Sequence, residues 1–210
     1  APLAGRISRL PHVRQVLMRL EFTGLLNNGR TDLPIVGEGV EADKEARLGS
    51  AVTVVAGRML KSDDAYGAVI GEGVAQALDL RPGSDVTLLV STPDGALNTV
   101  NLTVVGVIRT MSKDFDARAV RINLPAAQDL LLLNKVHKLV VELDDSAATA
   151  RVAPLLRHLL PVDRYEIKPW YELADFYRKV VELYKRQFGI LLFIVMVMVL
   201  AGVANSVNLS

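Results

Sequence analysis

Hydrophobic residues are spread unevenly along this chain, and the longest apolar run lies near its end. The run from Phe188 to Ser206 (FGILLFIVMVMVLAGVANS) contains nineteen residues with no charge and no proline. A helix of this length rises about 28 Å, close to the hydrocarbon thickness of a bilayer. A core helix of a soluble domain usually keeps a polar stripe, and this run has none before Asn205. The pattern predicts a transmembrane helix within residues 188–210, with a core helix or a buried strand as the alternative. Residues 1–187 would then form a domain held at a membrane surface.

A helical pattern with a spacing of three and four residues leads into this apolar run. It predicts a stalk helix over residues 170–187, beginning after Pro169 and continuing unbroken into the membrane. The opposite face carries mostly charged residues, as expected for a face in water. The apolar stripe packs either on the sheet of its own domain or on another helix, where it would couple the domain to the membrane. The residues of the stripe are Trp170, Leu173, Tyr177, Val180 and Tyr184.

Period-two alternation dominates the first part of the chain. Residues 13–26 alternate in part and predict a long half-buried strand, and Asn27-Asn28-Gly29 supplies the turn to a returning strand over 31–40. Residues 1–11 contain glycine and two prolines and are expected to be irregular. A short helix over 41–48 and a short strand over 52–55 follow.

Turn residues divide the rest of the domain into short elements. The patterns predict strands over 68–70, 85–90, 97–108 and 120–124, a helix over 73–80, and a polar loop over 111–119. Further on we expect helices over 125–133 and 147–160, the first opened by Pro125 and the second capped by Ser146. Strands over 138–143 and 165–168 complete a mixed α/β domain of the α+β class.

The amino-acid composition argues against several classes of function and of chemical site. The net charge is +1 and charged residues make up 22% of the chain, so no broad basic surface for nucleic acid is expected. The chain contains no cysteine, which excludes disulfides, cysteine nucleophiles and thiolate metal sites. The chain begins at Ala1 and stops soon after the apolar run, which suggests a segment cut from a larger membrane protein.

No stretch of the sequence predicts a catalytic, cofactor or metal site. Gly37-Glu38-Gly39 and Gly71-Glu72-Gly73 lack the third glycine of a dinucleotide loop, and no Walker A motif exists, so turns at strand ends explain these glycines. The acidic pairs are typical of loops and helix entries, and Asp114 and Asp116 fall in the polar loop. The histidines are isolated from other metal-ligating residues: His12, His137 and His158. In the apolar run, Gly202 and Ser206 form a small-xxx-small pair that allows close helix packing.

Three stretches in a fixed order resemble one family. They are VIGEGVAQALDLRPGSDVTLL, NTVNLTVVGVIRT and DFDARAVRINLPAAQDLL. With the first hairpin and the terminal apolar helix, they resemble the MacB-like periplasmic core domain of FtsX-like (type VII) ABC transporter permeases, which include lipoprotein-releasing permeases. The family's "vGD" is one residue longer here, at Pro82-Gly83-Ser84-Asp85. The matching residues are Ile70, Gly71, Glu72, Ala75, Leu78, Gly83, Val105, Gly106, Phe115, Asp116, Leu124, Ala127 and Gln128.

The resemblance implies a subunit that changes shape and catalyses nothing. It implies an extracytoplasmic domain (residues 1–187) of a bacterial inner-membrane permease, with residues 66–122 as a smaller β-rich subdomain. The implied partners are a second permease chain, in a homo- or heterodimer, membrane lipid, a possible lipoprotein or periplasmic adaptor, and a separate cytoplasmic ATPase that binds the ATP. The expected function couples ATPase-driven motion to export or release of a lipoprotein, lipid, drug or peptide. The alternatives are a non-transporting signalling or scaffold subunit and a membrane-anchored enzyme.

Overall fold

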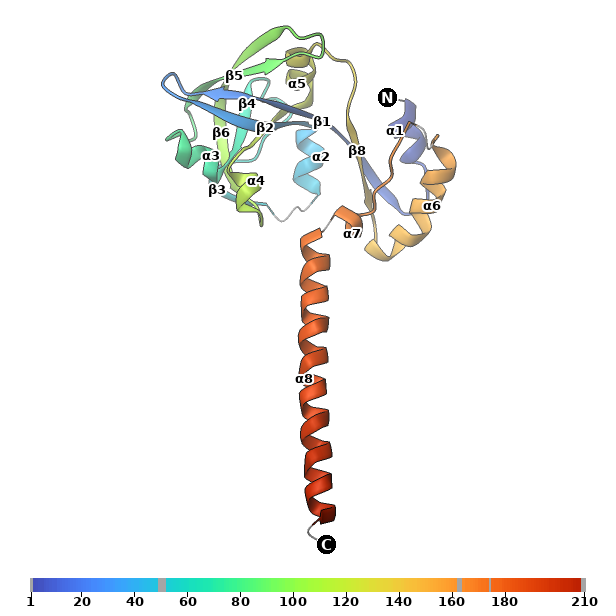
Figure 1. Cartoon of the computed structure of the whole chain (residues 1–210). Coiled ribbons are helices and arrows are strands. Elements are labelled where there is room, and N and C mark those ends of the chain that lie inside the picture. The colour runs from blue at the N-terminus through green and yellow to red at the C-terminus, as the bar shows by residue number, and fades with distance from the viewer. Residues whose placement is uncertain (1, 49–51, 162–163, 174, 209–210) are drawn as a thin grey trace. The chain divides into compact units, whose positions relative to one another are not determined.

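The computed structural model describes residues 2–48, 52–161, 164–173 and 175–208 (Figure 1). The side chains of residues 2, 173–182 and 200–208 lie outside this description. Contacts divide the chain into two units, Ala1–Ala148 and Thr149–Ser210. The predicted boundary between a domain over 1–187 and a membrane segment, and the β-rich subdomain over 66–122, stay predictions.

The first unit is built on an eight-stranded mixed sheet in which six strands close into a ring. The ring runs β1 (Val13–Asn27), β2 (Asp32–Val40), β7 (Ala119–Asn123), β4 (Gly67–Gly71), β6 (Leu97–Arg109), β5 (Asp85–Ser91) and back to β1. The β2–β7 and β4–β6 pairs are parallel and the other pairs of the ring are antiparallel. Outside the ring, β8 (Lys138–Leu143) pairs with the first half of β1, and β3 (Thr53–Gly57) pairs with the end of β6. The first hairpin and the predicted α+β class are confirmed.

Alternation along the strands fills the interior of this ring. In β5 the side chains of Val86, Leu88 and Val90 are buried, while the residues between them are exposed or half-buried. This is the period-two pattern of a strand with one face on a core. Leu20 and Leu26 of β1 and Ile122 of β7 are fully buried in the same cluster. Helix α5 (Leu124–Leu131) covers this core with Ala127, Leu130 and Leu131.

The described part of the first unit contains four further short α-helices, and two of them correct the sequence-based predictions. The lead-in forms α1 (Pro2–Ile7), and the polar loop contains α4 (Lys113–Asp116); α2 (Ala42–Arg47) and α3 (Glu72–Ala77) were predicted. Proline in the first turn suits α1 because its missing N–H needs no partner there. The hydroxyl of Ser112 caps α4 by accepting a hydrogen bond from the N–H of Phe115.

The helix predicted over 147–160 begins later than expected. Ser146 lies inside a 3₁₀ turn, η1 (Ser146–Ala148), and the helix α6 (Thr149–Leu159) begins after it. The carboxylate of Asp145 accepts the N–H of Ala147 at 2.9 Å, so an aspartate one residue earlier opens the turn.

The second unit contains α6, α7 (Trp170–Leu173) and α8 (Asp175–Asn208). The strand predicted over 165–168 does not form; these residues are irregular. Alternation over four residues cannot stabilise a strand without a neighbouring strand. From Asp175 one helix continues through the whole apolar run, as predicted, while continuity with α7 depends on residue 174, outside the described residues. No helix in the described part of the chain is long and apolar enough to cross a membrane, and the spanning helix stays a prediction.

Candidate functional site

Helix α8 carries most of the residues that the sequence singled out. Its 34 residues correspond to a length of about 51 Å. Trp170 in α7 is 50% exposed and packs edge-to-face on Tyr171, with ring centroids 5.9 Å apart. Tyr184 is 57% exposed. The side chains of the remaining stripe residues, Leu173, Tyr177 and Val180, and of the pair Gly202 and Ser206, lie outside the described residues. The stalk and its packing therefore stay predictions.

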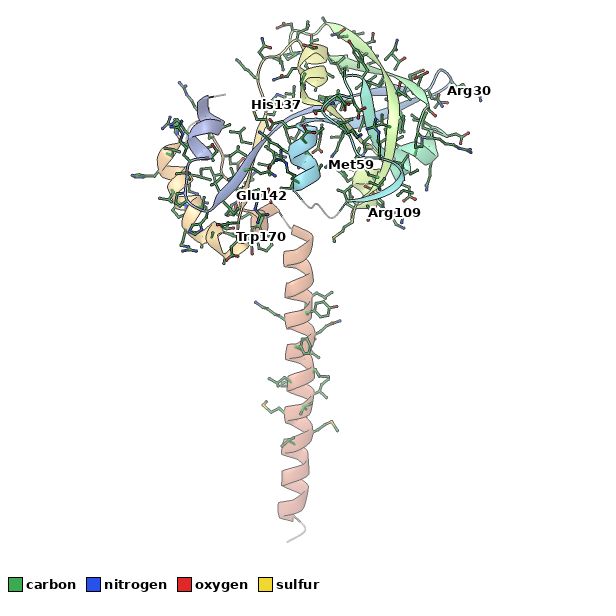
Figure 2. The ribbon with its side chains drawn as sticks, turned by 180° about the vertical axis from the view of Figure 1, so that it is seen from behind. Arg30, Met59, Arg109, His137, Glu142 and Trp170 are labelled. Carbon is green, nitrogen blue, oxygen red and sulfur yellow. The ribbon has the colours of Figure 1, made fainter. Side chains whose placement is uncertain are left out.

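The apolar run exposes side chains on every face of α8. Figure 2 shows the side chains drawn on this helix pointing away from its axis in all directions. Each large apolar side chain from Phe188 to Val199 has between 46% and 74% of its surface exposed. A helix that is apolar all round is stable in a buried or lipid environment rather than in water. The exposed apolar side chains of α8 would therefore be more stable in apolar surroundings, which the described residues do not provide.

Gly37-Glu38-Gly39 lies inside β2 rather than at the turn that was predicted. A Cβ at Gly37 would come within 2.1 Å of the Phe22 ring, and one at Gly39 within 2.3 Å of the Cβ of Ala127. Glycine is required at both positions because an aromatic ring and α5 pack directly on the strand. The glycines of this motif allow close packing inside the domain, and the motif forms a strand rather than a phosphate-binding loop.

Glu38 belongs to a buried network of two arginines and two carboxylates. Its Oε2 accepts the Nε–H of Arg121 at 2.8 Å, and both side chains are 10% exposed. Arg19 donates through Nε and Nη2 to Glu45 at 2.6 and 3.0 Å, and its Nη1 lies 3.8 Å from Glu38. The guanidinium of Arg121 also lies 6.0 Å from the centre of the Phe115 ring. The charges balance, and the network links β1, β2, β7 and α2.

Gly71-Glu72-Gly73 forms the junction of β4 and α3, the strand end that was predicted. Cβ atoms here would lie 2.1 Å from the carbonyl oxygen of Asp116 and 2.6 Å from the Cα of Ala117, so the glycines admit the backbone of α4. Arg109 donates two hydrogen bonds of 2.6 Å to Glu72, which holds the pKa of that carboxyl below its usual range. This second motif is also structural.

The polar sequence predicted that Asp116 lies in a loop, but the structure places it at the end of α4. The Asp116 side chain is buried. Its carboxylate accepts hydrogen bonds from the N–H of Thr110 and, at 2.8 Å, from the Thr110 hydroxyl.

The histidines are not all isolated either. His12 Nδ1 lies 3.3 Å from the carboxylate of Asp144 on the surface, and His137 Nδ1 bonds the carbonyl of Glu21. Within the described residues, no group of three possible ligands could hold a metal ion.

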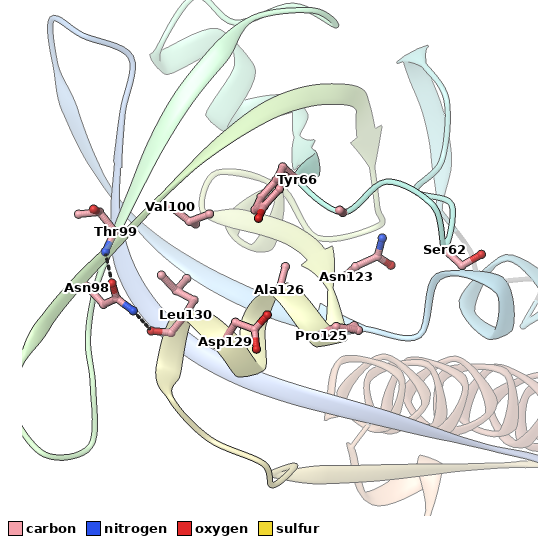
Figure 3. A pocket seen from close by; sticks show the side chains of 11 residues that line it. Ser62, Tyr66, Asn98, Thr99, Val100, Asn123, Pro125, Ala126, Asp129 and Leu130 are labelled. Carbon is pink, nitrogen blue, oxygen red and sulfur yellow. Dashed lines mark hydrogen bonds between the residues drawn. The ribbon is translucent and has the colours of Figure 1, made fainter.

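One pocket in the first unit was not anticipated (Figure 3). It has a volume of about 310 Å³ and lies between β6, the loop before β4, and α5. Val100, Ala126 and Leu130 supply its apolar lining, and polar groups come from Asn98, Thr99 and Asp129. Its residues come from three separate parts of the chain, so no local spacing in the sequence could reveal it.

The loop that borders the pocket is held by hydrogen bonds from a buried asparagine. Asn123, 5% exposed, donates through its amide to the carbonyl oxygens of Lys61 and Asp64 at 2.7 and 2.8 Å. Arg58 donates two hydrogen bonds to the Asp64 carboxylate, at 2.5 and 2.7 Å. These bonds, with one from the N–H of Lys61, hold the pKa of Asp64 below its usual range. The pocket rim is therefore pre-organised.

Comparison with known proteins gives matches in sequence and in fold. The sequence matches the family profile of the MacB-like periplasmic core domain over residues 2–159. The lipoprotein-releasing system transmembrane protein LolE of Haemophilus influenzae is 30% identical over 94 residues, which are 44% of this chain and 23% of LolE. The aligned part is thus less than a quarter of that relative.

Two solved structures share the fold. The periplasmic region of MacB from Actinobacillus actinomycetemcomitans has a TM-score of 0.53 and 18% identity, over 74% of this chain and 72% of that one. The extracellular domain of the ABC-type transporter YknZ from Gram-positive bacteria has a TM-score of 0.56 and 14% identity, over 74% and 81%. At such identities the likeness concerns the fold alone, and it confirms the predicted mixed α/β domain.

The family match extends over most of the chain and agrees with the resemblance found in its motifs. The family consists of periplasmic domains of ABC transporter permeases and is not a family of enzymes in themselves. Such domains are extracytoplasmic segments of inner-membrane proteins. The chain belongs to the family of MacB-like periplasmic core domains.

Proposed function

We propose that this chain is the extracytoplasmic domain of a bacterial ABC transporter permease subunit, anchored in the inner membrane by residues 188–206 of α8. The observation that carries the proposal is the family match over residues 2–159 in a chain that ends with the apolar helix α8. The exposed apolar side chains from Phe188 to Val199 support the anchor. Burying them in lipid would stabilise the inserted helix by about 25 cal/mol for each Å² removed from water.

The proposed mechanism is mechanical. Motion of the membrane part, driven by a separate cytoplasmic ATPase, would be passed outward by α8, because a continuous helix transmits displacement along its axis with little bending. The absence of a Walker motif from the sequence agrees with ATP being bound by another subunit. A second permease chain would complete the transporter.

The proposed cargo is a lipoprotein, lipid, drug or peptide. The match to the lipoprotein-releasing protein LolE supports release of a lipoprotein, and export of a lipid, drug or peptide is the wider class that the family resemblance implies. The permease would grip or release such a cargo, or a periplasmic protein that carries it, through shape changes of the first unit.

Purification of the full-length protein from its native membrane in mild detergent tests the proposal. Mass spectrometry of the co-purifying proteins is expected to find an ABC ATPase in stoichiometric amount, together with a lipoprotein or periplasmic adaptor. A matched purification from cells that lack the affinity tag identifies background proteins. Absence of any ATPase under several detergents would contradict the permease assignment. An ATPase without transport of any cargo would favour a signalling subunit.

A further inference from the structure

We propose that the pocket beside β6 is a docking site for an extended segment of a partner polypeptide that carries a basic side chain. The site is built from an unpaired strand edge, an apolar floor and one carboxylate. It lies wholly within the first unit and does not depend on transport.

The edge of β6 that faces the pocket lacks a neighbouring strand over half of its length. On one side β5 pairs with residues 97–103, whereas on the other side β4 pairs only from Thr103 onward. Asn98 at one end is tied to α5 through its amide and the carbonyl of Leu130, at 2.9 Å. Thr103 at the other end donates its N–H to Tyr66, also at 2.9 Å. Residues 99–102 lie between these ties, a gap of about 13 Å.

The orientation of the main-chain groups shows which of them face the gap. Val104 bonds Gly83 and Ser84 on the β5 side, and Thr103 bonds Tyr66 on the opposite side. Successive residues of a strand direct their N–H and C=O to opposite edges, so Thr99 and Asn101 face the gap as Thr103 does. Thr99 donates its N–H to the side chain of Asn98, at 2.9 Å. Among the described residues, no strand pairs with the C=O of Thr99 or with the main chain of Asn101.

These groups select an extended polypeptide over other ligands. A row of main-chain donors and acceptors at strand spacing is matched by another extended backbone, as in β-strand addition. Figure 3 shows Val100, Ala126 and Leu130 beside this edge, where they provide apolar contact for one side chain of such a segment. The exposed ring of Tyr66, also in the pocket wall, offers a flat surface for another. A pocket of about 310 Å³ holds a few residues of a chain rather than a folded element.

Charge specifies the side chain that the segment should carry. The carboxylate of Asp129 is exposed in the pocket wall and makes no ion pair with any residue that the structure describes. No basic side chain lines the pocket. A lysine or arginine of the incoming segment would complement Asp129, and an acidic one would be disfavoured.

The site is tested with two blocked seven-residue peptides on the full chain in detergent micelles. Both peptides alternate Thr and Val, and one has a central Lys while the other has a central Glu. Fluorescence anisotropy gives the affinity, and hydrogen-exchange mass spectrometry gives the location. We expect the lysine peptide to bind more tightly than the glutamate peptide and to protect residues 97–103 from exchange. Absence of binding by the lysine peptide at millimolar concentration would overturn the proposal.

Two variants test separately how much the open edge of β6 and the carboxylate of Asp129 contribute to peptide binding. Asn101→Pro removes an open main-chain donor on the free edge without removing a bond to β5, and it is expected to weaken the lysine peptide at least tenfold; Asn101→Val, which loses the same side chain, is its control. Asp129→Lys should reverse the preference between the peptides, by about threefold to fivefold each way as for exposed ion pairs. The same charge change at Asp114 on α4 should leave the preference as it was. Unchanged preference in Asp129→Lys would refute the site even if Asn101→Pro failed to fold.

Discussion

Replacing Arg121 by methionine tests whether the buried charge network stabilises the first unit through pairing. Arg121 bonds Glu38 at 2.8 Å, and both side chains are 10% exposed. In Arg121→Met, the nearest cation to Glu38 is Arg19, at 3.8 Å, and Arg19 is already engaged by Glu45. The variant therefore leaves a carboxylate that is buried and poorly compensated.

The expected magnitude follows from this geometry. Removing one partner of a buried ion pair typically destabilises a protein by about 3–5 kcal/mol. Because Arg19 remains near Glu38, we expect the lower end of this range, about 3 kcal/mol. Replacing Glu38 and Arg121 together by methionine removes both charges and leaves the pair of Arg19 and Glu45 intact. This double variant should lose less than about 1.5 kcal/mol, because apolar replacement of a whole buried pair is often nearly neutral.

Urea unfolding of the full chain in detergent micelles measures both variants. Hydrogen-exchange mass spectrometry of segments from β2 and β7 reports the first unit separately from the long helix α8. Arg14→Met is the matched control, since Arg14 pairs with Glu142 at 3.3 Å with 61% of its side chain exposed, and it should change the free energy of unfolding by less than about 1 kcal/mol. The reasoning is refuted if Arg121→Met loses no more than the double variant.

Three further predictions concern the close packing at Gly39, the titration of Asp64 and the transmission of motion by α8. Gly39→Ala should destabilise the first unit by about 2 kcal/mol, because its Cβ would lie 2.3 Å from that of Ala127; urea unfolding measures this, and a neutral result would contradict the close packing. Arg58 holds the pKa of Asp64 low, so the pair's contribution is present above the ordinary aspartate pKa of about 3.9 and is lost as the pH falls through the folded-state pKa. Thermal unfolding of Asp64→Asn at pH 7 and pH 3 should therefore show a smaller difference than the wild type does, and an equal difference would exclude the pair as its source. Val180→Pro should leave ATP hydrolysis in the reconstituted transporter but abolish transport, with Val180→Ala as control, because proline interrupts α8; undiminished transport would rule out the lever.

The strand elements were largely predictable because their signals are local. The run over 138–143 is rich in leucine and valine and is bounded by polar residues, and β8 occupies the same residues. The first hairpin was predicted from the turn chemistry of Asn27-Asn28-Gly29, and Asn27 pairs with Asp32 beside that turn. Where the signal was equally local but weak, as at residues 165–168, the prediction failed for lack of a neighbouring strand.

Closure of the ring and the identity of the pocket could not be predicted from one sequence. Gly24 of β1 pairs with Ile35 on one edge and with Val90 on the other, and nothing near Gly24 specifies the second partner. The same holds for Glu38 and Arg121, whose pairing follows only once β2 and β7 are parallel neighbours. The turn predicted at residues 37–39 was wrong, because these glycines lie inside β2 and admit an aromatic ring and a helix that are distant in the sequence.

The pairing of β1 also determines when the first unit can fold during synthesis. Val16 pairs with Val141, and Leu26 pairs with both Leu33 and Leu88, so the first strand finds its partners early, midway and near the end of the unit. A nascent chain that has reached residue 100 still lacks β7 and β8, which leaves edges of β1 and β2 open. Sheets that depend on such distant contacts form slowly and expose strand edges to aggregation meanwhile. The sheet of the first unit can therefore be completed only after residue 143 has been synthesised.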